Sequence, residues 1–491
     1  MLFYVGNYLK QKVRVFLKPN ILYIVIDGLR ADKFHGSSKT SVTPYLDNLV
    51  KNGTYFEQCI SSAPCTVPSV ASTITSLYPF ECIIQDEHIF TLNPKLDNHI
   101  LNLKKLGYTT YATYQDPISF LGLDDIYDFS EPYSVYEKLW NGLGEKIIKK
   151  LENGMNDPWF HYLQLYDLHL LAFPKEHRVN NGPDELNNKK FGANNYEQII
   201  SALDPWLKLF LEKIDLKNTL VIVTSDHGDY RASYNEYLEN FNYKNIDSKI
   251  HTPGLSFKIA KKLTSPIPKK LFFGRKKLIK FYTDKTQSKH AKKMIPTLNE
   301  IDDKLSPHFK RMMNHSVVGG SDVYDDRFKI PLLIFGYDIP SNKIIKQQVR
   351  SIDIFPTIFE IIESNTNSLG HGKSLLPLIY GETFEELPAF LEGAVNAPRF
   401  GSTDIIGIRT SNFKYFRHKS DITKVHLYDL KNDPLEEKNI AKNNSSIVKE
   451  MEEILIKLQN DQGFEYKKTE QILDIDEEKK IEEELRKLGY M

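Results

Sequence analysis

Cysteine is scarce in this chain, with 3 residues among 491. Cys59, Cys65 and Cys82 are too few to form the dense disulfide framework that supports many secreted proteins, so their scarcity fits a reducing compartment. The chain also lacks a net charge, because 64 Lys and Arg residues balance 64 Asp and Glu residues. The overall charge therefore points to no particular class of partner.

Long apolar runs are missing as well. Lys and Arg interrupt residues 1–16 before an apolar stretch long enough for a signal peptide or a membrane span forms. We therefore expect a cytoplasmic protein, with peripheral attachment to a membrane surface as an open alternative. No internal repeat is present. The hydrophobic content of 41% is sufficient for a large core, in one main domain with a subdomain.

Metal-capable side chains follow two apolar segments. Residues 219–225 form a continuous run that ends in Asp226, His227 and Gly228, and residues 21–26 form a similar run that ends in Asp27. Such runs are typical of buried parallel strands, whose carboxyl ends meet at one edge of an open α/β sheet. Together they predict a metal site at this edge, whereas the Asp-His pair alone also fits a surface turn.

A third segment places a hydroxyl beside a predicted helix. Thr66 precedes Pro68, which fits the first position of a helix that extends to about residue 77. Free backbone N–H groups and the helix dipole favour an anion at such an end. Thr66 is therefore a candidate nucleophile for a phosphate or sulfate group, and the alternative role is a helix cap.

Several blocks of the chain resemble, in order, the sulfatase-like branch of the alkaline phosphatase superfamily. The blocks are residues 19–32, 43–56, 325–336, 353–357, 372–378, 427–441 and 481–490. The resemblance, like the alternation of apolar strands and helices, implies an α/β fold with a doubly wound, mostly parallel central sheet. It also implies a smaller C-terminal α+β subdomain.

The resemblance implies a metal held by Asp27, Asp226 and His227, with Thr66 as the metal-bound nucleophile. A divalent cation suits these ligands, lowers the pKa of a coordinated hydroxyl and neutralises charge on the attacked oxyanion. Gly28 stands where many sulfatases have a second Asp ligand, so we expect Mn²⁺ or Zn²⁺ ahead of Ca²⁺ or Mg²⁺. We expect one divalent ion and not a full two-metal site.

The chain departs from the sulfatase motif Cys-x-Pro-Ser-Arg. Aligned on Pro68 and Ser69, Thr66 takes the Cys position and Val70 the Arg position. Cys65 is out of register by one residue and fits a small buried hydrophobe. Because Thr cannot become formylglycine, we expect a phosphate mono- or diester substrate, processed by hydrolysis or phosphotransfer through a covalent Thr66 intermediate.

Two alternatives to the phosphoester prediction stay open. The first is a sulfuric ester hydrolase. The second belongs to another class, a catalytically inactive relative that binds a polyanion or a membrane. The predicted substrate is an anionic ester of a small molecule, a lipid head group or a glycan. Nucleic acid is not expected as a partner, and the sequence predicts no oligomeric state.

Further site residues are predicted from family segments. Asp167 and His169 follow the apolar residues 160–165, where His169 is a candidate ligand for the substrate phosphate or a second metal, oriented by Asp167. His315 is a candidate acid for the leaving alcohol. For both His residues an ordinary loop or surface role is the alternative. We expect Arg30 to be a structural ion-pair or cap residue.

The predicted organisation has three parts. They are a catalytic α/β domain at residues 17–369, a C-terminal subdomain at residues 370–465 and a helical tail at residues 466–491. The first contains a Lys- and Arg-rich insertion at about residues 231–314. This insertion is interpreted either as a solvated segment or as a basic lid that attracts an anionic substrate or membrane.

Overall fold

The computed structural model describes residues 18–86, 89–115, 122–134, 137–168, 188–230, 306–318, 323–362, 369–393, 405–419, 421–462 and 467–468. Most of the basic insertion, at residues 231–305, lies outside these ranges, and so does the tail from residue 469. The domain boundaries predicted at residues 369 and 465 stay predictions. Within the described ranges, no helix combines the length and the apolar character that crossing a membrane requires.

The central sheet contains eight strands in the order β10-β2-β9-β8-β1-β7-β5-β6. Neighbouring strands run parallel except at β9, which lies antiparallel to both β2 and β8. This arrangement confirms the predicted mostly parallel sheet. The strands are β1 (Asn20–Ile26), β2 (Thr54–Ile60), β5 (Thr109–Gln115), β6 (Phe129–Tyr133), β7 (Trp159–Leu165), β8 (Thr219–Thr224), β9 (Lys329–Gly336) and β10 (Lys343–Arg350).

The three innermost predicted strands, β1, β7 and β8, are buried along their whole length. Their β-branched and aromatic residues suit a sheet that is covered on both faces. Ile26 of β1 pairs with Leu165 of β7, and Val25 pairs with Thr224 of β8. Because the strands are parallel and in this register, the residues that follow each of them emerge at the same edge of the sheet.

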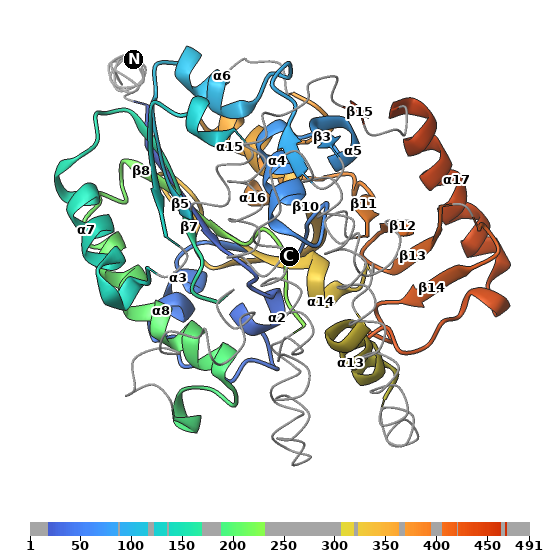
Figure 1. Cartoon of the computed structure of the whole chain (residues 1–491). Helices are drawn as coiled ribbons and strands as arrows, with labels where there is room; N and C mark the ends of the chain where they lie inside the picture. Colours follow the sequence, from blue (N-terminus) through green and yellow to red (C-terminus); the bar gives the residue numbers. More distant parts are fainter. Residues whose placement is uncertain are drawn as a thin grey trace, which may run out of the picture.

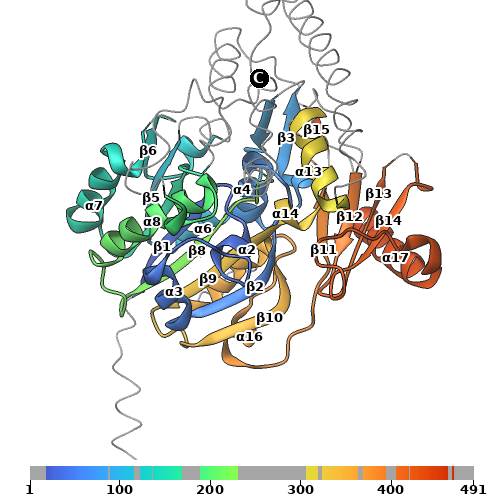
Figure 2. The same cartoon turned by 90° about the horizontal axis from the view of Figure 1, so that it is seen from below.

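Helices cover both faces of the sheet (Figures 1 and 2). Apolar residues of α3 (Pro44–Lys51), α7 (Leu143–Asn153) and α8 (Asn195–Leu211) share one core with the sheet. Those of α4 (Thr66–Thr75), α6 (His99–Lys105) and α15 (Ile354–Ile361) share the other. The double cover explains why the central strands read as continuous apolar runs.

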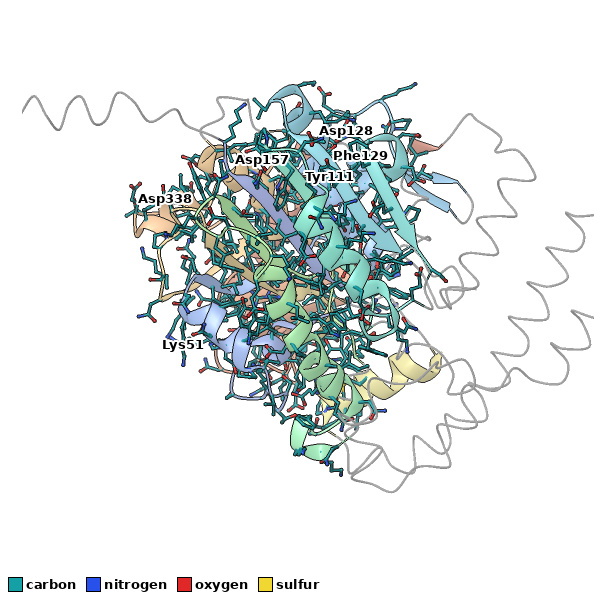
Figure 3. All side chains as sticks on the ribbon, turned by 90° about the vertical axis from the view of Figure 1, so that its left-hand side faces the viewer. Lys51, Tyr111, Asp128, Phe129, Asp157 and Asp338 are labelled. Carbon is teal, nitrogen blue, oxygen red and sulfur yellow. The ribbon has the colours of Figure 1, made fainter. Side chains whose placement is uncertain are left out.

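The outer strands β5 and β6 carry contacts that attach α7 to the end of the sheet. Tyr111 and Phe129 stack with their ring centroids 5.0 Å apart (Figure 3). Nζ of Lys150 in α7 lies 5.0 Å from the centre of the Tyr111 ring. Oδ2 of Asp128 accepts hydrogen bonds from the backbone and the hydroxyl of Thr110, both at 2.9 Å.

A second, antiparallel sheet in the order β11-β12-β13-β14 lies beside the first and packs against α17 (Figures 1 and 2). The sequence pattern of this region predicts antiparallel strands at residues 405–409 and 412–416 and a helix at residues 446–460, and β12, β13 and α17 lie close to these segments. The elements are β11 (Ala389–Glu392), β12 (Ile405–Arg409), β13 (Phe413–His418), β14 (Val425–Asp429) and α17 (Ser445–Gln462).

Short elements connect these layers. Two of them, α13 and α14, lie between the central sheet and the antiparallel sheet (Figures 1 and 2). The short helices are α2 (Ala31–Phe34), α5 (Pro79–Cys82), α13 (Pro307–Val318), α14 (Asp325–Phe328) and α16 (Leu376–Tyr380). A small third sheet has the order β15-β3-β4, with β3 (Ile83–Asp86), β4 (Ile89–Leu92) and β15 (Lys467–Lys468).

Candidate active site

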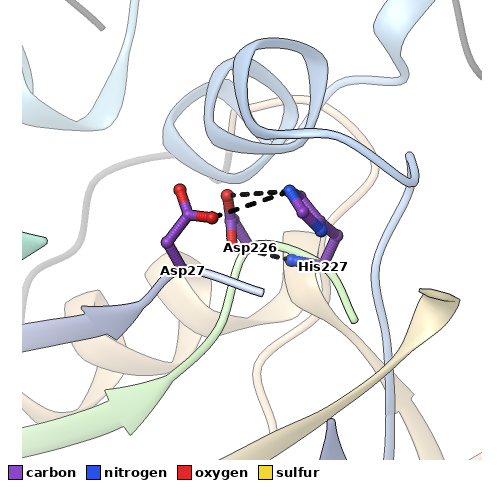
Figure 4. A group of neighbouring side chains, drawn as sticks. All are labelled: Asp27, Asp226 and His227. Atoms are coloured by element: carbon purple, nitrogen blue, oxygen red, sulfur yellow. Dashed lines mark hydrogen bonds and ion pairs between the residues drawn. The ribbon is translucent and has the colours of Figure 1, made fainter. Parts of the chain in front are cut away.

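Two carboxylates and one imidazole meet at the carboxyl edge of the central sheet. Asp27 follows β1, while Asp226 and His227 follow β8, and all three side chains are buried. One ligand atom from each lies within 4.8 Å of the others (Figure 4). In the described part of the chain, no other group of three His, Cys, Asp or Glu residues has this geometry. The predicted metal ligands are thus brought together.

Backbone donors fix the orientation of Asp226. Its Oδ1 accepts hydrogen bonds from the N–H of Gly28 at 3.1 Å and of His227 at 2.9 Å. Its Oδ2 is buried and accepts no hydrogen bond from the residues described. A buried carboxylate oxygen without a donor is costly unless a cation satisfies it, so this oxygen fits a metal ligand. Gly28 has a φ of +73°, which glycine adopts without strain.

The ring of His227 is held in one orientation. Nδ1 lies 2.9 Å from the carbonyl oxygen of Gly228. Because a carbonyl only accepts, Nδ1 donates, and in the neutral ring Nε2 then carries the lone pair. Nε2 lies 3.5 Å from Oδ2 of Asp226 and 3.9 Å from Oδ1 of Asp27. This tautomer is the one that binds a metal through Nε2.

Gln164 of β7 orients Asp27. Its Nε2 donates to Oδ2 of Asp27 at 2.9 Å, and its Oε1 accepts from the hydroxyl of Tyr162 at 2.8 Å. Gln164 is fully buried and was not among the predicted site residues. The sequence did contain a sign of this role, since Gln164 is a single amide in a mostly apolar segment. A buried amide needs a polar partner, so such a residue is a candidate for orienting a site residue.

Thr66 lies directly against the acidic group. Its Oγ1 is 3.2 Å from Oδ2 of Asp27 and 3.3 Å from Nε2 of His227. The prediction that Thr66 precedes the helix is wrong, because α4 begins at Thr66 and Pro68 is its third residue. Proline is tolerated there because the first-turn N–H groups of a helix have no intrahelical partner.

Serine hydroxyls join α4 to the loop after β8. Oγ of Ser61 and Oγ of Ser69 each donate to the carbonyl oxygen of Asp226 at 2.6 Å. Oγ of Ser225 donates to the carbonyl oxygen of His227 at 2.7 Å. These bonds hold the start of α4 and the loop of Asp226 and His227 in a fixed relation.

The electrostatics of the group favour a bound cation. Burial raises the pKa of Asp226, and the neighbouring charge of Asp27 raises it further. Two buried carboxylates whose oxygens lie within 4.8 Å of each other repel unless a cation lies between them. The donor set of two carboxylates and one imidazole therefore fits a divalent metal ion.

The remaining predicted residues lie in different situations. Asp167 is buried after β7, where its Oδ1 accepts from the N–H of Leu139 at 3.3 Å. His169 lies outside the described residues. His315 belongs to α13, and its side chain is outside the described part. Arg30 donates through Nε to Oδ1 of Asp32 at 2.8 Å, which confirms the predicted ion pair.

Comparison with known families assigns most of the chain. The family model described as "Sulfatase" matches residues 19–271, more than half of the chain. A second model, "N-sulphoglucosamine sulphohydrolase, C-terminal", matches residues 315–461.

Two curated relatives differ in how much they cover. Arylsulfatase K of Gallus gallus is 26% identical over 167 residues, which is 32% of this chain and 30% of that relative. The matched region thus spans less than a third of that relative. The multifunctional alkaline phosphatase superfamily protein PehA of Trinickia caryophylli is 24% identical over 492 residues, covering 86% of this chain and 91% of PehA.

Solved structures share the fold. A putative sulfatase from Bacteroides thetaiotaomicron has a TM-score of 0.60 at 15% identity, covering 91% of this chain and 93% of that chain. A second structure, solved with its substrate D-glucosamine-2-N,6-O-disulfate, has a TM-score of 0.58 at 15% identity, covering 90% of this chain and 98% of that chain.

Proposed function

Because the chain belongs to the sulfatase family, we propose that it is a metal-dependent hydrolase of anionic esters, with sulfuric esters as the first candidate substrates. Family membership and the arylsulfatase relative favour this alternative over the phosphoester substrate predicted from the sequence. The observation that carries the proposal is the position of Thr66 Oγ1, within 3.3 Å of both Asp27 and His227.

We assign the roles as follows. When bound by Asp27, Asp226 and His227, a divalent ion lowers the pKa of a coordinated hydroxyl and neutralises charge on the ester oxyanion. Thr66 Oγ1 attacks the sulfur or phosphorus, and its proton passes towards the nearest acceptor, Oδ2 of Asp27 at 3.2 Å. The bond to the substrate alcohol breaks, and His315 is the proposed donor of the proton that the alcohol takes up.

The second half of the reaction regenerates the hydroxyl. Water attacks the threonyl ester and gives one proton to His315, the bond between Oγ1 and sulfur or phosphorus breaks, and Thr66 recovers its proton from Asp27 while the inorganic anion leaves. An alcohol in place of water would make the same step a transfer. Asp167 and His169 stay proposed substrate-binding residues, and Mn²⁺ or Zn²⁺ stays the proposed ion.

A phosphoester is the second candidate substrate. It is favoured by Thr66 itself, which stands where the sulfatase motif has the cysteine that becomes formylglycine. An unmodified hydroxyl is a suitable nucleophile for phosphoryl groups. The similarity to PehA, whose name describes a multifunctional protein, supports testing both ester classes. A sugar is the proposed substrate alcohol, since a structural neighbour was solved with a sulfated glucosamine.

The test compares aryl sulfate, aryl phosphate and phosphodiester hydrolysis by the wild type, Thr66→Ala and the matched control Thr75→Ala. Thr75 is a buried hydroxyl of the same helix that donates to the carbonyl oxygen of Ala71. We expect faster hydrolysis of the sulfate, and a loss of about a thousandfold or more in kcat for Thr66→Ala alone, as is usual for a covalent nucleophile. Metal content, measured on the same samples, should be equal in all three.

Each other outcome has a defined meaning. Faster hydrolysis of either phosphate substrate would assign the second candidate. Metal binding without turnover of any ester would instead favour the inactive, polyanion-binding class. Normal turnover by Thr66→Ala would exclude Thr66 as the nucleophile.

A further inference from the structure

The short helix α14 contacts all three loops of the candidate site through two adjacent residues. The carbonyl oxygen of Arg327 accepts from the N–H of Gly228, next to His227, at 2.8 Å. Nη2 of Arg327 donates to the carbonyl oxygen of Pro64, two residues before Thr66. Oδ1 of Asp326 pairs with Nη1 of Arg30, three residues after Asp27, at 2.5 Å.

The contact between α14 and the metal loop leaves no space. A Cβ atom added to Gly228 would lie 2.1 Å from the carbonyl oxygen of Asp326 and 3.2 Å from Cγ of Arg30. Only glycine allows the two backbones to approach this closely. The loop that carries Asp226 and His227 therefore rests directly on α14.

Asp326 is a buried charge with two partners. Its carboxylate pairs with Arg30 on one side and accepts from Nε2 of His308 at 3.0 Å on the other. Burial acts against the charge, but Arg30 and His308 together lower the pKa of Asp326. Arg30 is held in turn by Asp32 at 2.8 Å and, at its backbone N–H, by the hydroxyl of Tyr196 at 2.9 Å.

These bonds converge on groups whose relative position decides the chemistry of the site. The loops after β1 and β8 supply the proposed metal ligands, and the loop that contains Pro64 leads directly into Thr66, the proposed nucleophile and first residue of α4. The three bonds described above do not involve a metal-ligand atom. Their effect is to set where the three loops stand relative to one another.

We propose that Asp326 and Arg327 are positioning residues that hold the metal ligands and Thr66 in register, an inference that rests on the proposed function. They act on the metal and the substrate only through the loops that they join. Groups in this outer position typically change metal affinity or activity by about 10- to 100-fold when they are removed.

The test uses Arg327→Met, Arg327→Lys and Asp326→Asn, with Asp353→Asn as a matched control. Asp353 belongs to another buried ion pair, with Nη2 of Arg350 at 2.6 Å, on a different part of the sheet edge. Affinity for Mn²⁺ and Zn²⁺ is measured by equilibrium dialysis, together with kcat, KM and thermal unfolding. Amide hydrogen exchange of residues 27–30, 61–66 and 225–230 reports the loops directly.

We expect Arg327→Met and Asp326→Asn to lower metal affinity and kcat by about 10- to 100-fold with little change in KM. Amide exchange in a folded protein is proportional to the equilibrium constant for local opening. If the lost bonds raise that constant about tenfold or more, exchange in the three loops should rise by the same factor. Arg327→Lys should recover part of the loss, because its ammonium can still donate to the carbonyl of Pro64. Asp353→Asn should lower the melting temperature without changing affinity or exchange in these loops.

The inference would be overturned if Arg327→Met and Asp326→Asn kept the metal affinity and the loop exchange of the wild type. It would also be overturned if these variants changed both quantities no more than Asp353→Asn does. The proposed function fails in a different way, when the wild-type chain hydrolyses neither sulfate nor phosphate esters. The exchange measurement still decides the positioning role in that case, because it needs neither turnover nor a bound metal.

Discussion

The orientation of each side chain at this site is fixed by hydrogen bonds to neighbouring groups. Two backbone N–H groups hold one oxygen of Asp226, one carbonyl holds Nδ1 of His227, and the amide of Gln164 holds Asp27. The bonds to Asp226 and His227 leave Oδ2 of Asp226 and Nε2 of His227 facing each other, 3.5 Å apart. The remaining atoms of the three side chains are thereby directed at one another, which is the arrangement that a metal ion requires.

Asp167 gives a pH-dependent prediction at the scale of one residue. Burial raises its pKa to about 6 from 3.8. The folded chain therefore keeps a proton that the unfolded chain has lost, so the free energy of unfolding falls as the pH rises from about 4 to about 6 and levels off above. This loss amounts to about 3 kcal/mol for a difference of about two pKa units.

Asp167→Asn should remove this loss, because the amide carries no charge and its oxygen still accepts from the N–H of Leu139. Urea unfolding at a series of pH values measures the effect. The variant should match the wild type near pH 4 and exceed it above pH 6 by up to about 3 kcal/mol. Curves that stay parallel across this range would contradict the assignment.

At the scale of elements, the site depends on how closely loops and short helices approach. The loop after β8 lies against α14 on one side, and on the other it is bonded to Ser61, which follows β2, and to Ser69 of α4. This loop has no freedom to move without breaking buried hydrogen bonds. The position of residues 225–230 therefore follows from packing between elements, since their own sequence contains a glycine.

Gly228→Ala tests this packing. The added Cβ would meet the carbonyl oxygen of Asp326 at 2.1 Å, a backbone atom that cannot rotate away. We expect a loss of about 1–3 kcal/mol in the free energy of unfolding, as for other overpacked sites, together with weaker metal binding. Gly107→Ala is the control, because its φ of +84° adds backbone strain while no atom lies within 4 Å. Equal metal affinity in both variants would show that the loop can shift at no cost.

At the scale of the whole molecule, buried charges join the antiparallel sheet to the central sheet. Arg409 of β12 donates to both carboxylate oxygens of Asp325 in α14, at 2.9 and 2.8 Å. It also donates to the side chains of Gln348 at 2.8 Å and Gln58 at 2.9 Å, on β10 and β2. Lys414 of β13 pairs with Asp325 as well, at 2.5 Å. The second sheet thereby reaches the helix that supports the site.

Arg409→Met should destabilise the chain by about 3–5 kcal/mol, because it leaves Asp325 with only part of its buried partners. Arg417→Met is the control, since Arg417 of β13 pairs with the partly exposed Glu452 of α17, at 2.9 Å. This ion pair does not reach the central sheet. Urea unfolding measured by two probes, fluorescence and circular dichroism, compares the two variants. A smaller effect for Arg409→Met than for Arg417→Met would mean that the two sheets are not coupled through this cluster.

The sequence predicted the strands and the edge at which their polar residues meet. Continuous apolar runs and the residues that end them depend on local patterning, so Asp27, Asp226 and His227 were identifiable without coordinates. The sequence was a weaker guide to the substrate class. Thr66 is the candidate nucleophile, but one hydroxyl does not distinguish sulfate from phosphate, and family membership favours the sulfuric ester.

Other features were decided only by the tertiary structure. The bond from Gln164 to Asp27 spans 137 residues, that from Gly28 to Asp226 spans 198, and that from Arg327 to Pro64 spans 263. Sequence periodicity reports which face of an element is buried and does not report which distant loop it meets. The candidate metal ligands were therefore predictable from the sequence, whereas the residues that orient them became visible only once the sheet had brought the loops together.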